Sequence, residues 1–260
     1  MKKVISLSVF VTLMFISLAV LTGNEKPAVQ HGNDSEVHWG YEGAGGPEHW
    51  GDLKAEYEMC GEGMAQSPID LKQAVGAELQ AIRTDYKSTP LKILNNGHTI
   101  QVNYETPSSY VIDGKTYKLL QFHFHTPSEH TVEGDFHEME MHLVHQNDQG
   151  QLAVLGVFME QGKANSVIEK IWDHMPSEIN SEKTVSGVTV NASNLLPEDK
   201  SYYHYYGSLT TPPCSEGVNW TVLKSPITVS KKQVKAFADM VGENNRPVQP
   251  LNSRFILESD

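Results

Sequence analysis

A cluster of histidines in the middle of the chain has the spacing of a metal site. The stretch QFHFHTPSEH (residues 121–130) carries His123 and His125, and EMEMHLVH (residues 138–145) carries His142. Residues two apart in a strand point to the same face, so His123 and His125 share one face and the intervening phenylalanines the other. If the two segments are neighbouring strands, three imidazoles converge. Three neutral imidazoles with one open position are the ligand set of a catalytic zinc ion.

Each of these segments also carries a polar residue two positions before a histidine. Gln121 precedes His123, and Glu140 precedes His142. A metal-binding histidine usually donates its second ring N–H to a carboxylate, amide or carbonyl oxygen, which fixes the tautomer of the ring. Gln121 and Glu140 are therefore predicted to support the metal ligands. A bare His-x-His pattern would be weak evidence in a chain with twelve histidines, and these two residues strengthen it.

Other histidines and one glutamate close to the cluster receive a different interpretation. His145 falls on the opposite strand face from His142, and it is assigned, with His130 and His137, to structure or hydrogen bonding. The stretch HFHTPSE also fits the HxHxxxE half of the cupin metal motif, in which Glu129 itself would bind the metal. That match is partial, because the preceding glycine and the second motif of cupins are both missing.

The rest of the sequence predicts a mainly β protein. Alternating apolar and polar residues, separated by turn residues, indicate strands in LKILNNGHTIQVNY, KTYKLLQFHFH, MEMHLVHQ, LAVLGVFME and NWTVLKSPITV. Helical spacing occurs in SVIEKIWDHM, after Asn165, and in KKQVKAFADMV, after Ser230, which can cap a helix N-terminus. We expect a single domain built on a mainly antiparallel sheet with a few short surface helices.

The first 23 residues have the pattern of a secretory signal peptide. Lys2 and Lys3 precede an uncharged apolar run that is followed at once by polar residues. The run is also long enough for a transmembrane anchor, but the immediate polar continuation favours a cleaved signal and no stable membrane insertion afterwards. Residues 24–36 are expected to be a disordered lead-in to one domain over residues 37–260. The protein is therefore expected to be exported, either periplasmic or secreted.

Cysteine content and charge constrain the exported part. Cys60 and Cys214 are the two cysteines of the chain, and an oxidising compartment favours a disulfide between them. The net charge of −12 makes the surface repel phosphates and anionic lipid, so no nucleic acid partner is expected.

Several motifs, in order along the chain, resemble the α-class carbonic anhydrases and among them the exported bacterial members. They are HWGYEGAGGPEHW, QSPIDL, NNGHTIQV, QFHFHTPSEH, EMHLVH, YYGSLTTPPCSEGVNW and NNRPVQPLNSR, which span nearly the whole mature chain. The resemblance implies a central, twisted, largely antiparallel sheet of about ten strands with Zn²⁺ in a cone-shaped cleft. It implies carbon dioxide and bicarbonate as small-molecule substrates, and a homodimer as a possible assembly.

Carried over residue by residue, the resemblance implies roles around the zinc ion. His123, His125 and His142 would be the ligands, and Gln121, Glu140 and the main-chain carbonyl of Asn244 would accept their second N–H groups. Thr210 would accept the proton of zinc-bound hydroxide and donate to Glu129. Thr211 would contact bicarbonate.

The same resemblance implies a proton path and a substrate wall. His98 would be the proton shuttle, a role suited to an imidazole with a pKa near 6.5. Tyr41 and Asn96 would order its water chain. The apolar wall beside the metal would be Val144, Val154, Leu209 and Trp220, and Cys60 and Cys214 match the disulfide of secreted members.

The reaction implied is the zinc-dependent, reversible hydration of carbon dioxide to bicarbonate and a proton through zinc-bound hydroxide. Two alternatives stay open at this point. One is a cupin-like metalloenzyme, and the other is a binding protein that has the anhydrase fold without catalysis. The complete set of ligand histidines argues against the second.

Overall fold

A computed structural model describes residues 38–105 and 107–259. The signal peptide predicted over residues 1–23 and the lead-in predicted over residues 24–36 lie outside the described residues and stay predictions. None of the helices in the described ranges has both the length and the apolar character needed to cross a membrane.

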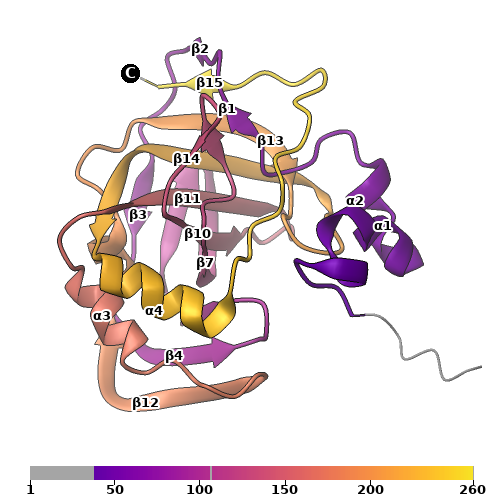
Figure 1. Ribbon diagram of the computed structural model, residues 1–260. Helices are drawn as coiled ribbons and strands as arrows, with labels where there is room; N and C mark the ends of the chain where they lie inside the picture. The colour runs from indigo at the N-terminus through magenta and orange to yellow at the C-terminus, as the bar shows by residue number, and fades with distance from the viewer. Residues whose placement is uncertain (1–37, 106, 260) are drawn as a thin grey trace, which may run out of the picture. The chain divides into compact units, whose positions relative to one another are not determined.

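Within the described residues, twelve strands form one large sheet, and three short strands form a second (Figure 1). The large sheet runs in the order β12 (Ser181–Val190), β4 (Thr89–Asn95), β5 (Ile100–Asn103), β7 (Lys115–His125), β10 (Met139–Gln146), β11 (Leu152–Gln161), β14 (Glu216–Val229), β13 (Tyr202–Ser208), β15 (Leu257–Glu258) and β2 (Val75–Gly76). Beside this path, β6 (Ser109–Ile112) pairs with both β7 and β3 (Arg83–Asp85). The small sheet contains β1 (Asp70–Leu71), β8 (Thr131–Val132) and β9 (Asp135–Phe136).

The large sheet is mainly antiparallel, as predicted. Among the described strand pairs of this sheet, only β11–β14 and β15–β2 are parallel. Strands β7 and β10, which carry the three histidines, are antiparallel neighbours near the middle of the path. The site is therefore built on central strands, whose positions are fixed by pairing on both sides.

A β-bulge at Leu120 changes the phase of β7. Gln121 pairs with Val144 of β10, whereas Leu119 pairs with the next residue, so Leu120 is an extra residue without a partner in that pairing. Leu119 and Phe122 consequently face the same hydrophobic cluster although they are three residues apart. After the bulge, the phenylalanines stay in the core and the histidines two apart occupy the opposite face.

The two helices predicted from the sequence are present. Helix α3 (Ser166–Trp172) is capped by the side chain of Asn165, and α4 (Lys231–Val241) begins with a capping box formed by Ser230 and Gln233. The two helices lie side by side (Figure 1), with Trp172 of α3 stacked on Phe237 of α4 at 5.4 Å between ring centroids. Both rings contact Phe124 edge-on, so the helices cover the aromatic face behind the histidines.

The segment before the first strands contains short helical turns that the sequence patterns did not predict. They are η1 (Gly43–Gly45), η2 (Pro47–His49), α1 (Trp50–Leu53), η3 (Ala55–Tyr57) and α2 (Met59–Glu62), and η4 (Ala192–Leu195) lies later in the chain. These turns are too short for a helical period to show in the sequence. The disulfide between Cys60 and Cys214 is confirmed, and it packs in one cluster with Trp50.

Candidate metal centre

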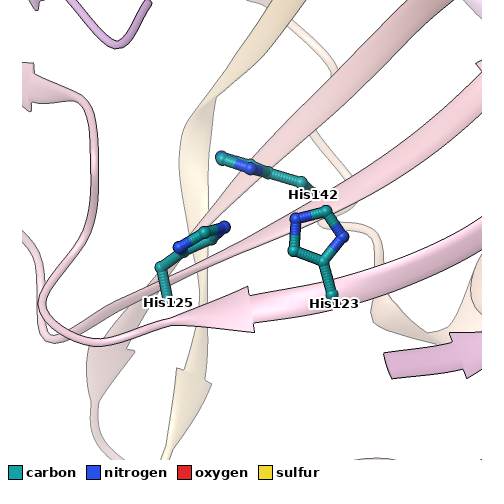
Figure 2. Close-up of side chains that lie close together, drawn as sticks. All are labelled: His123, His125 and His142. Atoms are coloured by element: carbon teal, nitrogen blue, oxygen red, sulfur yellow. The ribbon is translucent and has the colours of Figure 1, made fainter. Parts of the chain in front are cut away.

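The three histidines predicted to bind metal converge on one point. His142 of β10 pairs directly with His123 of β7, and His125 pairs with Glu140. The ring centroids lie 5.1 Å apart for His123 and His125, 5.4 Å for His123 and His142, and 4.6 Å for His125 and His142. One nitrogen of each ring lies within 4.8 Å of the other two. Figure 2 shows the three rings turned toward a common space from two adjacent strands.

Hydrogen bonds to oxygen atoms fix which nitrogen of each ring is free. His123 donates from Nδ1 to Gln121 Oε1 at 2.8 Å, and His142 donates from Nε2 to Glu140 Oε1 at 2.9 Å. His125 donates from Nδ1 to the main-chain oxygen of Asn244 at 2.8 Å. Each ring therefore keeps one unprotonated nitrogen for a ligand, which is Nε2 of His123 and His125 and Nδ1 of His142.

Burial favours the neutral form of two of these rings. It lowers the pKa of His123 well below its ordinary value of 6.5, and the neighbouring imidazoles of His125 and His142 lower it further. Burial also lowers the pKa of His125. For His142, burial acts in the same direction, but the carboxylate of Glu140 outweighs it and raises the pKa. A metal ion at this point would meet three imidazoles, held by an amide, a main-chain carbonyl and a carboxylate, and an imidazole donor set suits Zn²⁺.

The free nitrogen of His125 supports this interpretation. His125 is 1% exposed, and its Nε2 is a buried atom with no hydrogen-bond partner among the described residues. A buried polar atom without a partner is costly, so its presence calls for an explanation. A bound cation between the three rings would supply the missing partner.

Glu140 is the centre of a buried hydrogen-bond network behind His142. Its Oε1 also accepts from His130 Nδ1 at 2.8 Å, and its Oε2 accepts from the main-chain N–H groups of Glu129 and His130, both at 2.9 Å. Burial alone would raise the pKa of Glu140, but His130 and His142 hold it well below its usual range. The ionised carboxylate therefore fixes the orientation of the His142 ring.

The network continues from His130 to two residues that sequence reasoning missed. His130 Nε2 lies 2.7 Å from the hydroxyl of Tyr205, which lies 2.8 Å from the hydroxyl of Ser67. His130, Glu140 and His142 could also group around a cation, but both ring nitrogens of His130 have hydrogen-bond partners. The assignment of His130 to hydrogen bonding therefore agrees with its contacts.

Glu129 lies beside the metal centre and is fully buried. Its Oε1 accepts from the main-chain N–H of Arg246 at 2.8 Å. Its Oε2 lies 3.6 Å from His125 Nε2 and 3.8 Å from His142 Nδ1 and has no hydrogen-bond partner among the described residues. No hydrogen bond of the described residues joins Glu129 to Thr210, which is 5% exposed. The Thr210–Glu129 bond implied by the resemblance therefore stays a prediction.

His98 lies on the turn between β4 and β5. The side chain of Asn96 shapes this turn by accepting from the main-chain N–H groups of His98 and Thr99, both at 2.9 Å. The His98 ring stacks on Trp39 with 3.5 Å between ring centroids, and Tyr41 lies edge-on at 6.5 Å. Burial, with a smaller contribution from His38, lowers the pKa of His98. Asn96 and Tyr41, which the family resemblance groups with His98, lie next to it, and their role in a water chain stays a prediction. No role had been predicted for Trp39.

The four residues predicted to form an apolar wall lie in one hydrophobic cluster, and three of them form a row across the sheet. Val144 pairs with Val154, and Val154 pairs with Trp220. Leu209 packs against the same cluster. The Trp220 ring lies 4.9 Å from that of His142, so the wall adjoins the metal centre. Thr211, predicted to contact bicarbonate, is half-buried next to Thr210 on the loop after β13.

Comparisons with known proteins agree on one family. Residues 45–260 match the model of the eukaryotic-type carbonic anhydrases. This chain belongs to the α-carbonic anhydrase family. It is 49% identical over 225 residues to a carbonic anhydrase of Klebsiella pneumoniae, a comparison that covers 85% of this chain and 91% of the relative.

A solved structure extends this agreement to the fold. The α-carbonic anhydrase of Thermovibrio ammonificans, in complex with the inhibitor sulfanilamide, has a TM-score of 0.82 and 49% identity, covering 85% of this chain and 98% of the other. The chain is also similar to proteins with other names. Dioscorin dioA3 of Dioscorea japonica is 34% identical over 221 residues, covering 82% of each chain.

The residues missed by sequence reasoning have one property in common within this α-carbonic anhydrase. Trp39 stacks directly on His98, whereas Tyr205 and Ser67 connect to Glu140 only through His130, and all three come from distant parts of the sequence. None of them is at a fixed spacing from the histidine motifs. All three lie in motifs that carry the family resemblance, Trp39 in HWGYEGAGGPEHW, Ser67 in QSPIDL and Tyr205 in YYGSLTTPPCSEGVNW, but nothing in those motifs pointed to these contacts.

Proposed function

We propose that this protein is a zinc-dependent carbonic anhydrase that interconverts carbon dioxide and bicarbonate with release or uptake of a proton. Membership of the α-carbonic anhydrase family supports the reaction. The observation that carries the proposal is the convergence of three imidazole nitrogens within 4.8 Å of one another, each opposite a ring N–H already held by an oxygen atom.

His123, His125 and His142 would hold the ion. When bound, zinc lowers the pKa of a coordinated water to about 7 and so supplies a nucleophile at neutral pH, an effect for which carbonic anhydrase itself is the reference case. Gln121, Glu140 and the carbonyl of Asn244 keep the three rings oriented.

The neighbouring residues would position the reactants. The row of Val144, Val154 and Trp220 offers an apolar surface where carbon dioxide can rest next to the metal. Thr210, buried beside this surface, would orient the nucleophile through its hydroxyl, with Glu129 as its acceptor, and Thr211 would bind the bicarbonate product.

The proton would leave through His98. An imidazole can accept and release a proton near neutral pH, and the turn that carries His98 is only partly buried, so the ring can pass the proton to buffer.

We infer that the protein is exported to the periplasm or the exterior. The disulfide between Cys60 and Cys214 is compatible with an oxidising compartment. A homodimer stays a prediction, which sedimentation of the purified protein tests.

A stopped-flow assay of carbon dioxide hydration tests the proposed function. We expect hydration that is lost with a zinc chelator and restored by added zinc. The His142→Ala variant should lose both activity and bound zinc. His137→Ala is the matched control, because His137 lies nearby on the same segment but stacks on Phe158 outside the centre. Bound zinc without hydration would favour a non-catalytic binding protein, and bound iron with oxygen consumption would favour a cupin-like enzyme.

A further inference from the structure

We propose that the side chains of Thr99 and Asn244 form a brace that positions the shuttle histidine, His98, relative to the metal-binding strand β7. The inference rests on the proposed function, because His98 has a role in the reaction only if a proton must leave the metal centre. Neither Thr99 nor the side chain of Asn244 had a role assigned from the sequence.

Beyond the last main-chain pair of β5 and β7, the side chain of Thr99 makes the hydrogen bonds to β7. That register runs from Asn103 opposite Gln121 to Gln101 opposite His123. At the next position of β7, Phe124 donates its main-chain N–H to Thr99 Oγ1 at 3.2 Å, and its carbonyl accepts from the same hydroxyl at 2.6 Å. A hydroxyl can donate and accept at once, so one side chain satisfies both main-chain groups of Phe124.

Asn244 links His98 to His125 directly. Its side-chain Nδ2 donates to the main-chain oxygens of His98 and Phe124, both at 2.9 Å. Its Oδ1 accepts from the N–H of Thr126 at 2.8 Å, and its main-chain oxygen accepts from the ring of His125. Asn244 is fully buried, so these bonds are shielded from competing water.

The turn that carries His98 needs such an attachment. Gly97 has a φ of 85°, in the left-handed region that few other residues adopt, and the turn is closed by the short bonds to Asn96. Local bonds fix the shape of the turn but not its distance from β7. Thr99 and Asn244 fix the distance between the turn and β7. Both connect residues 98–99 to Phe124, the residue between the two ligands of β7.

The brace should therefore affect proton export more than metal binding. A displacement of about 1 Å of a reacting group can cost on the order of 100-fold in rate. The ring of His125 is held by the main-chain oxygen of Asn244, which survives a change of the side chain.

The test uses Thr99→Val, which replaces the hydroxyl by a methyl group of similar shape, together with Asn244→Ala and the double variant. Thr126→Val is the matched control. Thr126 lies next to His125, and its hydroxyl donates to the Glu138 carbonyl at 2.9 Å rather than to the His98 turn.

Two readouts separate positioning from general damage. In zinc-free protein, the Cε1–H proton signal of His98, assigned with His98→Gln, reports the stacking on Trp39 through the ring current. We expect this signal to move toward that of free histidine in the brace variants but not in Thr126→Val. In the zinc enzyme, turnover in weak buffer should fall about tenfold relative to turnover in saturating imidazole, and Thr99→Val should leave zinc affinity unchanged within about twofold.

Folded brace variants with a wild-type His98 signal would overturn the proposal. So would an equal loss of turnover in weak and saturating buffer, which would place Thr99 and Asn244 in the metal centre itself. If wild-type protein shows no hydration, the proposed function fails separately, and the zinc-free His98 signal still decides whether the brace exists.

Discussion

The carboxylate of Glu140 occupies the space that a side chain at Gly156 would need. Gly156 lies opposite His142 in the β10–β11 pair, and a Cβ at Gly156 would lie 3.0 Å from Glu140 Oε1. This oxygen holds both His142 and His130. The absence of a side chain on β11 therefore helps to set the position of a metal ligand on β10.

Gly156→Ala should weaken zinc binding without removing any donor. The added methyl group would also lie 3.3 Å from Val222 Cγ2, so we expect the Glu140 carboxylate to move by a few tenths of an ångström to make room for it. We expect a loss of zinc affinity of about tenfold, measured by competition with a chromogenic chelator. Wild-type affinity in a folded Gly156→Ala protein would show that Glu140 moves freely.

Glu140→Gln removes the charge that holds His142 and His130. The amide keeps the shape but presents an N–H₂ group to one of its donors, so a buried hydrogen bond is lost. Zinc affinity should fall by about 10- to 100-fold. Glu138→Gln, two residues earlier and on the exposed surface, serves as the control in the same chelator competition.

Val154→Phe should slow hydration while leaving zinc in place. Val154 is 2% exposed in the middle of the row formed by Val144, Val154 and Trp220, so a larger ring must fill the space beside the metal centre. We expect kcat/KM to fall by more than about tenfold, equivalent to ~1.4 kcal/mol in the barrier. Metal analysis of the same preparation should give full zinc occupancy, and loss of zinc would contradict this explanation.

His145 makes the fold sensitive to acid. Burial lowers its pKa from an ordinary value of 6.5 to about 3, since the ring lies in the core between Tyr86, at 2.8 Å, and the Ala153 carbonyl. Between pH 6.5 and about 3 the unfolded chain binds a proton at His145 that the folded chain does not, so stability falls as the pH falls.

The contribution of His145 can be measured as the slope of the free energy of unfolding against pH. It should amount to about 1.4 kcal/mol per pH unit within this window. Urea unfolding at several pH values, in one metal state, should give a shallower pH dependence for His145→Gln than for the wild type. His49→Gln, at a side chain that is 51% exposed, is the control. Equal slopes for wild type and His145→Gln would show that His145 does not cause the acid sensitivity.

The disulfide should contribute strongly to stability. Cys60 and Cys214 are 154 residues apart, and closing a loop of that length restricts the unfolded chain by up to about 5 kcal/mol. We expect the double variant Cys60→Ser, Cys214→Ser to unfold at lower denaturant concentration. Reduction of the wild type should reproduce this shift, whereas reduction of the double variant should change nothing.

Local patterns predicted the parts of the site that lie on single strands. The spacing of His123 and His125 and the position of Gln121 follow from strand alternation, and the structure places these side chains on one face. Alternation also placed His145 away from His142, as the core contacts of its ring confirm. The capping residue of α4 was equally readable, because Ser230 acts within one turn of the chain.

Hydrogen-bond partners that come from distant segments could not be predicted from local sequence patterns. The acceptor for His125 comes from Asn244, 119 residues away, and only the family resemblance suggested it. Tyr205 reaches His130 from another region of the chain, and Ser67 reaches Tyr205 from a third. Hydrogen bonds of this kind are set by the tertiary fold, and no spacing in the sequence encodes them.

The bulge at Leu120 determines which side chains of β7 face the core and which face the metal centre. With strict alternation, a strand that buries Leu119 would bury His123 as well, and the phenylalanines would be turned to the opposite face, away from the core. One surplus residue, itself 41% exposed, lets the first half of the strand keep its aliphatic and aromatic core while the second half turns its imidazoles outward. Shortening β7 by that single residue would thus disable the site without altering any atom that touches metal or substrate.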